Sequence, residues 1–400
     1  MKRASWVWLH RYVGLVMAGF LVLTGLTGSV LAFQSELDAW LNPRLFRVEQ
    51  AGAGPLSPSQ LIGQAERDNP GLQAYAIILP DTPQRSAIVL GGARDAAAAL
   101  DYNQLFLDPA TGATLGRRLN GAFGLDRERL IPFLYRLHYT LATPGRWGEW
   151  LLGGIALAWM LDCFVGFYLT LPRGRPFWRK WRPAWKIKRG AGAYRLNFDL
   201  HRAFGLWLWL VLFLVALSSM ALNLNREVFR PIVAAVLPTS PSLWDDPRPA
   251  VPPAFALDWD AAAQKAREEA DRRGWDSPLG IIHAARAEGF YMMRFGREHE
   301  PGFGASVMYV SGVDGRILSV REAGGGKAGD VVNELMFPIH SGQVAGLSGR
   351  ILICVAGLVI AMLSVTGVYI WWKKRVPRVT RRRRPPELAV PGSGEIDAVR

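Results

Sequence analysis

Four long apolar stretches constrain the fold of this chain more than any other feature of its sequence. They run over residues 12–33, 150–171, 203–224 and 351–372, and each is as long as the roughly 20 residues that an α-helix needs to cross a bilayer. Asp162 is the one charged residue inside them. The first stretch is too long for a signal-peptide core and no A-x-A site follows, so it is predicted to remain as an anchor. The predicted fold class is an α-helical membrane protein with four transmembrane helices.

Basic residues indicate which ends of these helices face the cytoplasm. Lys and Arg cluster directly beside the apolar runs, in residues 2–11, 173–195 and 373–384. With four spans all three clusters lie on one side, and the positive-inside rule makes that side the cytoplasm. Both termini are then cytoplasmic and the two long loops lie outside. Despite the net charge of +14, no nucleic-acid partner is expected.

The basic loop between the second and third spans also carries three tryptophans, Trp178, Trp181 and Trp185. Aromatic rings among basic residues are typical of the headgroup region of the lipid bilayer. The favoured interpretation is a loop that sets topology and binds lipid. A binding site for another macromolecule is the alternative.

The sequence also repeats itself. Three motifs recur at offsets of 191, 202 and 201 residues. They are His10-Arg11 before Gly14 with His201-Arg202 before Gly205, Leu137-His138 with Ile339-His340, and Gly166-Phe167-Tyr168 with Gly367-Val368-Tyr369. Similar offsets of this size indicate an internal duplication of a unit made of span, outside domain and span.

Each long loop is predicted to form a small α+β domain. Residues 57–68 and 258–273 have the pattern of amphipathic helices, the first capped by Ser57 before Pro58. Alternating segments with turn signals follow in each loop, at 74–79, 86–90 and 104–107 in the first and at 279–284, 290–295 and 306–310 in the second. One helix on a short antiparallel sheet is expected in each copy.

Eight segments summarise the predicted organisation of the chain. They are a first transmembrane helix with a cytoplasmic N-terminus (1–34), an extracytoplasmic α+β domain (35–149), a second transmembrane helix (150–172), a basic cytoplasmic loop (173–200), a third transmembrane helix (201–224), a second extracytoplasmic α+β domain (225–348), a fourth transmembrane helix (349–372) and a basic cytoplasmic tail (373–400). The tail after Arg384 is expected to be disordered.

Four of the six histidines stand beside the predicted spans. His10 and His201 lie at the cytoplasmic ends of the first and third, and His138 and His340 lie just outside the second and fourth. A single histidine at a membrane end is more often an interfacial residue than a ligand. Two at each face, related by the repeat, favour ligands. His283 and His299 fall in the second outside domain instead.

Two histidines from facing helices suit a haem. Each ring can give one nitrogen to the iron while the other nitrogen donates a hydrogen bond, and a six-coordinate iron suits electron transfer because no position is left open for substrate. A span of about 20 residues rises roughly 30 Å. Iron can therefore be shared by His10 and His201 or by His138 and His340, but not across the bilayer. The prediction is two b-type haems, with no residue assigned a catalytic role.

Two kinds of residue beside the histidines have two interpretations each. Gly14 and Gly205 follow a histidine by four residues and so lie on the same helix face. A missing side chain there either lets the flat ring approach the backbone or allows close helix packing. Arg11 and Arg202 are placed to meet haem propionates, or they serve as topogenic charges.

Asp162 is a candidate of its own, because an ionisable group inside a membrane span is costly. The favoured expectation is a structural hydrogen bond to a neighbour such as Ser218, Ser219 or Ser364. The alternative is a proton relay or the tuning of a haem potential.

Other site types are less well supported. A zinc or copper site is the competing metal hypothesis, but each face offers two histidines and no Cys or carboxylate at ligand spacing. Cys163 and Cys354 lie in apolar runs, so no Cys-based motif is predicted. Residues 324–327 lack the spacing of a phosphate loop, and no dinucleotide fingerprint occurs, so neither nicotinamide nor flavin is expected.

Several short motifs in order resemble the PepSY-associated transmembrane family. They are HRYVGLVMAGFLVLTGLTGSVLAFQSELD, RLHYT, HRAFGLW, FPIHSG and TGVYIWW, and the two outside domains, with the LDPATG turn, resemble PepSY domains. The layout is similar to dihaem inner-membrane ferric-siderophore reductases of the FoxB type. The resemblance implies His10, His138, His201 and His340 as haem ligands and iron release in the periplasm as the task. One departure is that the third span ends in LVALSSMALN where the first and fourth carry Thr-Gly.

The leading functional hypothesis is therefore a haem-dependent oxidoreductase of the bacterial inner membrane. It passes electrons from an unidentified donor to a periplasmic ferric-siderophore complex, which releases iron(II). A non-redox protein that binds or regulates a peptidase or an envelope component is the alternative. A transporter of iron or its chelate is disfavoured, because four spans with one buried charge leave little material for a polar path.

Overall fold

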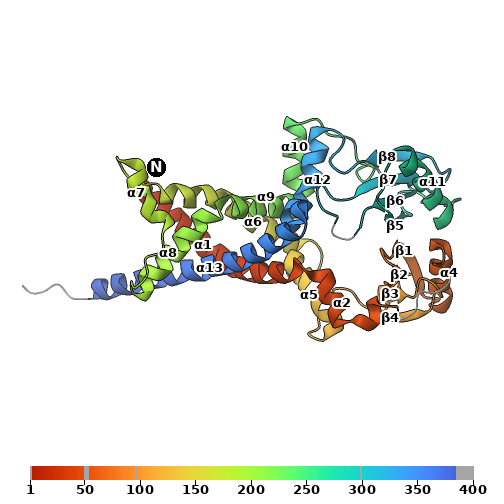
Figure 1. The fold of residues 1–400 in the computed structure, drawn as a ribbon, viewed down its shortest axis with the longest axis horizontal. Coiled ribbons are helices and arrows are strands. Elements are labelled where there is room, and N and C mark those ends of the chain that lie inside the picture. The colour runs from red at the N-terminus through yellow and green to blue at the C-terminus, as the bar shows by residue number, and fades with distance from the viewer. Residues whose placement is uncertain (1, 49–53, 96, 298–299, 384–400) are drawn as a thin grey trace, which may run out of the picture.

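The structure is a computed structural model that describes residues 2–48, 54–95, 97–297 and 300–383. His299, Arg384 and the predicted tail up to residue 400 lie outside these residues. Figure 1 shows an elongated molecule, with a bundle of long helices at one end and a β-sheet with its own helices at the other. We call the two ends of the bundle the N-terminal end, where residue 2 lies, and the sheet end.

Within the described residues, three helices are long and apolar enough to cross a membrane: α1 (Arg3–Leu31), α6 (Trp147–Thr170) and α13 (Gly346–Arg383). A fourth crossing exists if α8 (Ala193–Trp207) and α9 (Trp209–Asn223) count as one span. These two helices are bent by 72° around Leu208. The chain is thus a multi-pass membrane protein.

The bend corrects the expectation of one continuous helix over 203–224. The helix begins ten residues earlier, at Ala193, and breaks after Trp207. Its two halves have different neighbours, because α8 packs along α13 and α9 packs along α6 and α12. Apolar residues on both sides of the break form one run in the sequence, so hydropathy alone joins them.

Helices α1 and α13 pack along each other more extensively than any other pair of described helices. A Cβ added to Gly25 would lie 2.6 Å from the carbonyl oxygen of Gly357, and one added to Gly357 would lie 2.5 Å from that of Gly25. Ser29 Oγ donates to the carbonyl of Cys354 at 2.8 Å. Small residues let helix backbones approach in this way in membranes.

The loop at the N-terminal end of the bundle forms α7 (Phe177–Trp181) and a 3₁₀ turn, η1 (Arg182–Trp185). Trp181 is buried against Phe167 and Leu171, while Trp178 is exposed. The three predicted interfacial tryptophans therefore do not share one environment.

Eight strands form one continuous antiparallel sheet in the order β4-β3-β2-β1-β5-β6-β7-β8. The strands are β1 (Leu72–Ile78), β2 (Ala87–Ala93), β3 (Gln104–Leu107), β4 (Thr114–Arg118), β5 (Leu279–Ala285), β6 (Phe290–Phe295), β7 (Ser306–Ser311) and β8 (Ile317–Arg321). The expected segments are strands, and each half has a fourth strand that the alternation did not predict. The halves join where Ile77 pairs with Ile282, so two edge strands cover each other.

Two helices pack on one face of this sheet, α4 (Pro58–Asp68) and α11 (Trp259–Arg272). Ser57 caps α4 in a capping box with Gln60, as expected from the sequence. The carboxylate of Asp260 accepts from Ser57 Oγ at 2.5 Å and from the backbone N–H of Ser59 at 2.9 Å. The first turn of α11 therefore binds the first turn of α4, across the junction between the two halves of the sheet.

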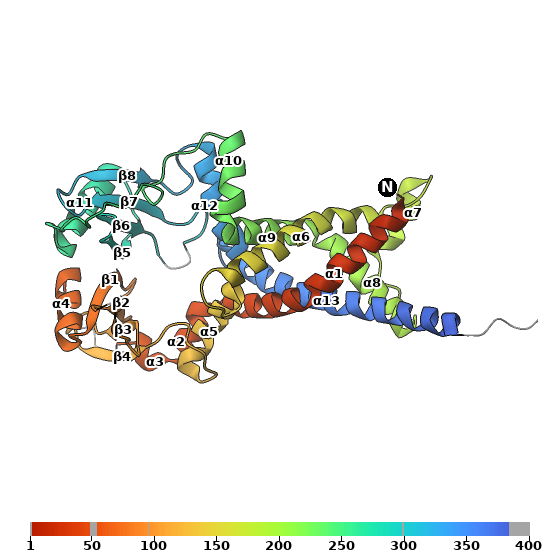
Figure 2. The ribbon, with the colours of Figure 1, turned by 180° about the vertical axis from the view of Figure 1, so that it is seen from behind.

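Shorter helices connect the sheet to the bundle. They are α2 (Gln34–Leu41), α3 (Pro43–Phe46), α5 (Arg127–Thr140), a π-helical turn η2 (Asn225–Phe229), α10 (Arg230–Val236), α12 (Ala328–Ser341) and a 3₁₀ turn η3 (Gln343–Ala345). Arg118 on β4 and Asp38 on α2 form a buried two-pronged ion pair, with nitrogen–oxygen distances of 3.0 and 2.7 Å. Figure 2 shows α5 and α12 where the bundle meets the sheet domain. The order helix, four strands, short helix, span occurs in both halves of the chain.

Candidate functional site: two histidine pairs in the bundle

The four span-associated histidines form two pairs at the two ends of the bundle. His10 on α1 and His201 on α8 have ring centroids 6.2 Å apart, and we call them the N-terminal-end pair. His138 on α5 and His340 on α12 have ring centroids 6.1 Å apart and form the sheet-end pair. Thr27, which contacts His138, follows His10 by 17 residues on α1, so the pairs are separated by about 25 Å along that helix.

At the N-terminal-end pair each ring is held through Nδ1. His10 Nδ1 lies 2.9 Å from Asp162 Oδ2 on α6. His201 Nδ1 lies 3.0 Å from the carbonyl oxygen of Leu363 and 3.1 Å from Thr366 Oγ1, both on α13. A carboxylate and a carbonyl only accept hydrogen bonds, so the proton of each ring is assigned to Nδ1 from this network.

At the sheet-end pair the same ring nitrogen meets hydroxyl groups. His138 Nδ1 lies 2.9 Å from Thr27 Oγ1, and His340 Nδ1 lies 3.3 and 3.4 Å from the hydroxyl oxygens of Ser218 and Ser219. All three hydroxyls donate to carbonyl oxygens of their own helices. They are therefore left as acceptors toward the rings, which again assigns the ring proton to Nδ1.

This arrangement leaves the four Nε2 atoms available. In the described parts of the chain, no protein group forms a hydrogen bond with any of them. A neutral imidazole protonated at Nδ1 carries its free lone pair on Nε2, which is the atom that binds a metal when the other nitrogen is held by a neighbour. Each pair thus presents two ligating nitrogens.

Three glycines lie against these rings. A Cβ added to Gly28 would come within 3.0 Å of His138 Cε1, and one added to Gly367 within 3.2 Å of His201 Cε1. One added to Gly166 would be 3.5 Å from His10 Cε1. The repeated glycines at 166 and 367 therefore face the two rings of the N-terminal-end pair. In both Thr-Gly motifs, Thr27-Gly28 and Thr366-Gly367, the threonine meets Nδ1 and the glycine makes room for the ring.

A cavity of about 460 Å³ opens beside the N-terminal-end pair, within the usual range for cofactor and ligand sites. Gly14 and Gly205 line it, and a Cβ added to either would meet nothing within 4 Å. The packing interpretation of these two glycines is therefore wrong, since Gly25 and Gly357 make the close helix contact instead. A flat ring at this pair has room over both of them.

The two predicted arginines both line this cavity but differ in their partners. Arg202 donates to Asp199 Oδ1 at 2.8 Å and to the carbonyl of Pro183 at 2.7 Å. Arg11 forms no ion pair or hydrogen bond with the described residues, which leaves it free to meet an anionic group.

Asp162 has a different partner from the one expected. None of the three serines named from the sequence bonds to it. Its Oδ2 takes His10, and its buried Oδ1 has no hydrogen-bond partner among the described residues. Because α6 runs antiparallel to α1, a residue in the second half of α6 reaches the level of His10 near the start of α1.

An apolar layer separates the two pairs. Leu212, Val215 and Ile360 are buried there, with Leu21 and Trp159 packed against them. Leu21 lies between His10 and Thr27 on α1, and Leu212 lies between His201 and Ser218 along α8 and α9. These side chains are all apolar, and Leu21, Trp159, Leu212 and Ile360 also line the cavity beside the N-terminal-end pair.

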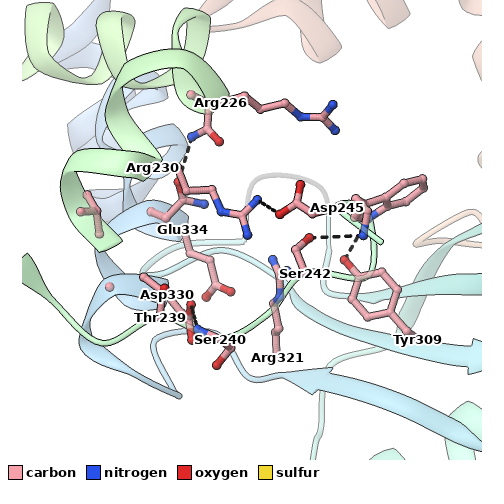
Figure 3. Close-up of a pocket in the computed structure, with 15 residues that line it drawn as sticks. Arg226, Arg230, Thr239, Ser240, Ser242, Asp245, Tyr309, Arg321, Asp330 and Glu334 are labelled. Atoms are coloured by element: carbon pink, nitrogen blue, oxygen red, sulfur yellow. Dashed lines mark hydrogen bonds and ion pairs between the residues drawn. The ribbon is translucent and has the colours of Figure 1, made fainter. Parts of the chain in front are cut away.

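A second cavity, of about 240 Å³, lies beside the sheet end of the bundle, between α10, α12 and strands β7 and β8 (Figure 3). Arg230 pairs with Asp245, and Asp330 accepts from the backbone N–H of Ser240 at 2.9 Å. Burial raises the pKa of Glu334, which lines the same cavity. Opposite charges face one another here and connect the second half of the sheet domain to α12, the helix that carries His340.

Comparison with known families adds one finding. The family model described as the PepSY-associated TM region matches residues 7–374, a range that includes both histidine pairs and the whole sheet. The chain belongs to this family. No curated protein matches it.

The spacing of the paired rings is compatible with a haem iron bound by two imidazoles. Two imidazoles on opposite sides of one metal, each with a bond of about 2 Å, place their ligating nitrogens about 4 Å apart and their ring centres about 6 Å apart. Both observed pairs have that spacing. Among the described residues, no group of three or more His, Cys, Asp or Glu side chains is arranged to hold a metal ion. The open wall at Gly14 and Gly205 suits a flat ligand.

Proposed function

We propose that the protein is a transmembrane electron-transfer protein that holds two b-type haems and reduces a ferric complex outside the cytoplasm. The observation that carries the proposal is the recurrence of one arrangement at both ends of the bundle. Each end has two rings about 6 Å apart, with Nδ1 held by the protein and Nε2 free. A histidine buried for packing alone needs neither a matched partner ring nor a free nitrogen facing it.

Each part of the chain has a role in this function. Haem supplies an iron that gains and loses one electron reversibly. The four histidines would ligate the two irons on both sides, which leaves no open position for substrate. Thr27, Thr366, Asp162 and the two serines hold the rings in orientation. The apolar layer between the pairs excludes water and ions while electrons pass.

The substrate assignment follows from topology and family resemblance. With the basic loops in the cytoplasm, the N-terminal-end pair receives electrons from a one-electron donor on that side, and the sheet-end pair lies near the periplasm. Each electron that leaves the donor converts one iron(III) to iron(II) in the acceptor complex. A siderophore holds iron(II) less tightly, because the ion is softer and carries less charge, so reduction releases it.

A spectrum of the purified protein tests the proposal directly. The reduced-minus-oxidised difference is expected to show low-spin b-type bands, and extraction is expected to yield two haems per chain. A colourless preparation, with histidines that tolerate Ala without loss of function, would contradict it and favour a non-redox protein that binds a peptidase or an envelope component.

A second measurement addresses the substrate. Protein in sealed vesicles that enclose a reductant is expected to reduce a ferric-hydroxamate complex added outside. Uptake of labelled complex without any donor would instead support a transporter.

A further inference from the structure

The two histidine pairs differ in the charge of the groups that hold them. His10 donates to the carboxylate of Asp162, whereas His138 and His340 donate to hydroxyls and His201 to a carbonyl and a hydroxyl. Asp162 is 7% exposed, and among the described residues His10 is its one ion-pair or hydrogen-bond partner. Among the described residues, the bundle therefore holds a carboxylate against one pair and none against the other.

A buried carboxylate next to an iron ligand favours the more positive state of the iron. Ferric haem with two neutral imidazoles carries one positive charge on its core, and ferrous haem carries none. Opposite charges in a low-dielectric interior attract strongly, and a carboxylate that accepts the Nδ1 proton makes the imidazole a stronger donor to the metal. Both effects stabilise iron(III) relative to iron(II), whereas a hydroxyl partner has no charge to contribute.

We propose that Asp162 is a positioning residue that makes the iron held by His10 and His201 harder to reduce than the iron held by His138 and His340. Electrons then run downhill from the N-terminal end to the sheet end. This inference rests on the proposed function, because it needs haem at both pairs. It makes the charge of Asp162 the cause of the direction in which electrons move.

The geometry around Asp162 supports a role toward His10 rather than toward the fold. Among the described residues, Oδ1 of Asp162 is buried without a hydrogen-bond partner, so His10 is the one polar contact of the carboxylate. In the buried ion pair of Arg118 and Asp38, by contrast, both carboxylate oxygens accept. Gly166, one turn further along α6, makes room for the His10 ring. Both features of α6 therefore serve the same histidine.

The test is an equilibrium redox titration of purified wild-type protein and Asp162→Asn, followed by absorbance and by electron paramagnetic resonance. The wild type is expected to titrate as two components of unequal midpoint. Asn keeps the shape and can accept the same hydrogen bond but carries no charge. In Asp162→Asn the reduction equilibrium constant of the lower-midpoint component should increase at least tenfold, which raises its midpoint by about 59 mV for one electron. The upper midpoint should not change.

Two further variants separate charge from packing. Asp162→Glu keeps the charge and should keep the lower midpoint low. Thr366→Val removes a hydroxyl at the same pair but leaves the Leu363 carbonyl as an acceptor. The reduction equilibrium constant of the lower-midpoint component should therefore change less than threefold. The low-spin resonance signal of the lower component should change in Asp162→Asn alone.

Three outcomes would overturn the inference: a wild type whose components share one midpoint, an Asp162→Asn protein with both haems and unchanged midpoints, and an equal shift of both components. If Asp162→Asn does not fold, Asp162→Glu and the two wild-type midpoints still decide the question. A wild type without haem bands would refute the proposed function instead, so the two failures are distinguishable.

Discussion

The N-terminal-end pair and the sheet-end pair are built to the same ring spacing from different kinds of helix. His10 and His201 sit on the helices that enter the membrane, with an open cavity beside them. His138 and His340 sit on α5 and α12, short helices that precede the spans α6 and α13. A carboxylate, a carbonyl and a hydroxyl hold the first pair, whereas hydroxyls and no carboxylate among the described residues hold the second. Equal spacing with unequal partners is the pattern that the proposed function requires of two haem sites with different potentials.

Removing one ring from each pair gives the largest expected effect. His201→Ala and His340→Ala should each lose one of the two haems, because a ligand to that iron is gone, and each should abolish reduction across the membrane. Absorbance and extracted haem per chain measure the loss. His283→Ala, at a histidine on β5 outside both pairs, should keep two haems. Loss of both haems in each single variant would show that the pairs are not independent sites.

Filling the cavity should affect one pair only. Gly14→Leu places a side chain where the protein leaves open space, so it should block haem at the N-terminal-end pair and leave the sheet-end component intact. The apo fold has room for this side chain, so expression and melting temperature should change little.

The matched control is another glycine of α1. Gly25→Ala meets the Gly357 carbonyl at 2.6 Å and should destabilise the bundle by roughly 1–3 kcal/mol through overpacking, with a lower melting temperature and no preference for either haem. If Gly14→Leu keeps both haems, the cavity is not the cofactor site.

Removing a hydroxyl should have a smaller effect. Thr27→Val removes the hydroxyl acceptor of the His138 Nδ1 proton, which costs about 1 kcal/mol for one hydrogen bond. The expected result is a small shift of the upper redox midpoint and a lower thermal stability of the sheet-end haem, both followed by absorbance. A shift of the lower midpoint instead would mean that the two components are assigned to the wrong pairs.

The smallest expected effect concerns pH and lies outside both pairs. Burial lowers the pKa of His283 below its ordinary value of 6.5, so the folded protein favours its neutral form. The contribution of neutral His283 to the free energy of unfolding is fully present above about pH 6.5. It declines as the pH falls from that value toward the lower pKa of the folded state. His283→Gln should make the melting temperature less dependent on pH between 8 and 5, with both haem spectra unchanged. An unaltered pH dependence would contradict a neutral, half-buried His283.

The sequence carried enough information for the membrane class, the histidine pairs and the α+β elements. Long apolar runs, histidines placed at span ends and alternating strand patterns are local signals, and each depends on residues close together in the chain. The Thr-Gly motifs were visible too, but nothing local shows that Thr27-Gly28 meets His138 or that Thr366-Gly367 meets His201. The internal duplication and the side of the membrane on which the sheet lies stay predictions.

Tertiary structure decided what the local signals left open. The partner of Asp162 depends on the alignment of two antiparallel helices whose residues are 152 positions apart, so the sequence suggested nearby serines where packing supplies His10. The break at Leu208 depends on different neighbours for α8 and α9. The single eight-stranded sheet depends on the pairing of β1 with β5, where Ile77 meets Ile282, 205 positions away in the chain. Residue type and spacing determined which side chains can ligate, and helix packing decided which of them also receives a charge.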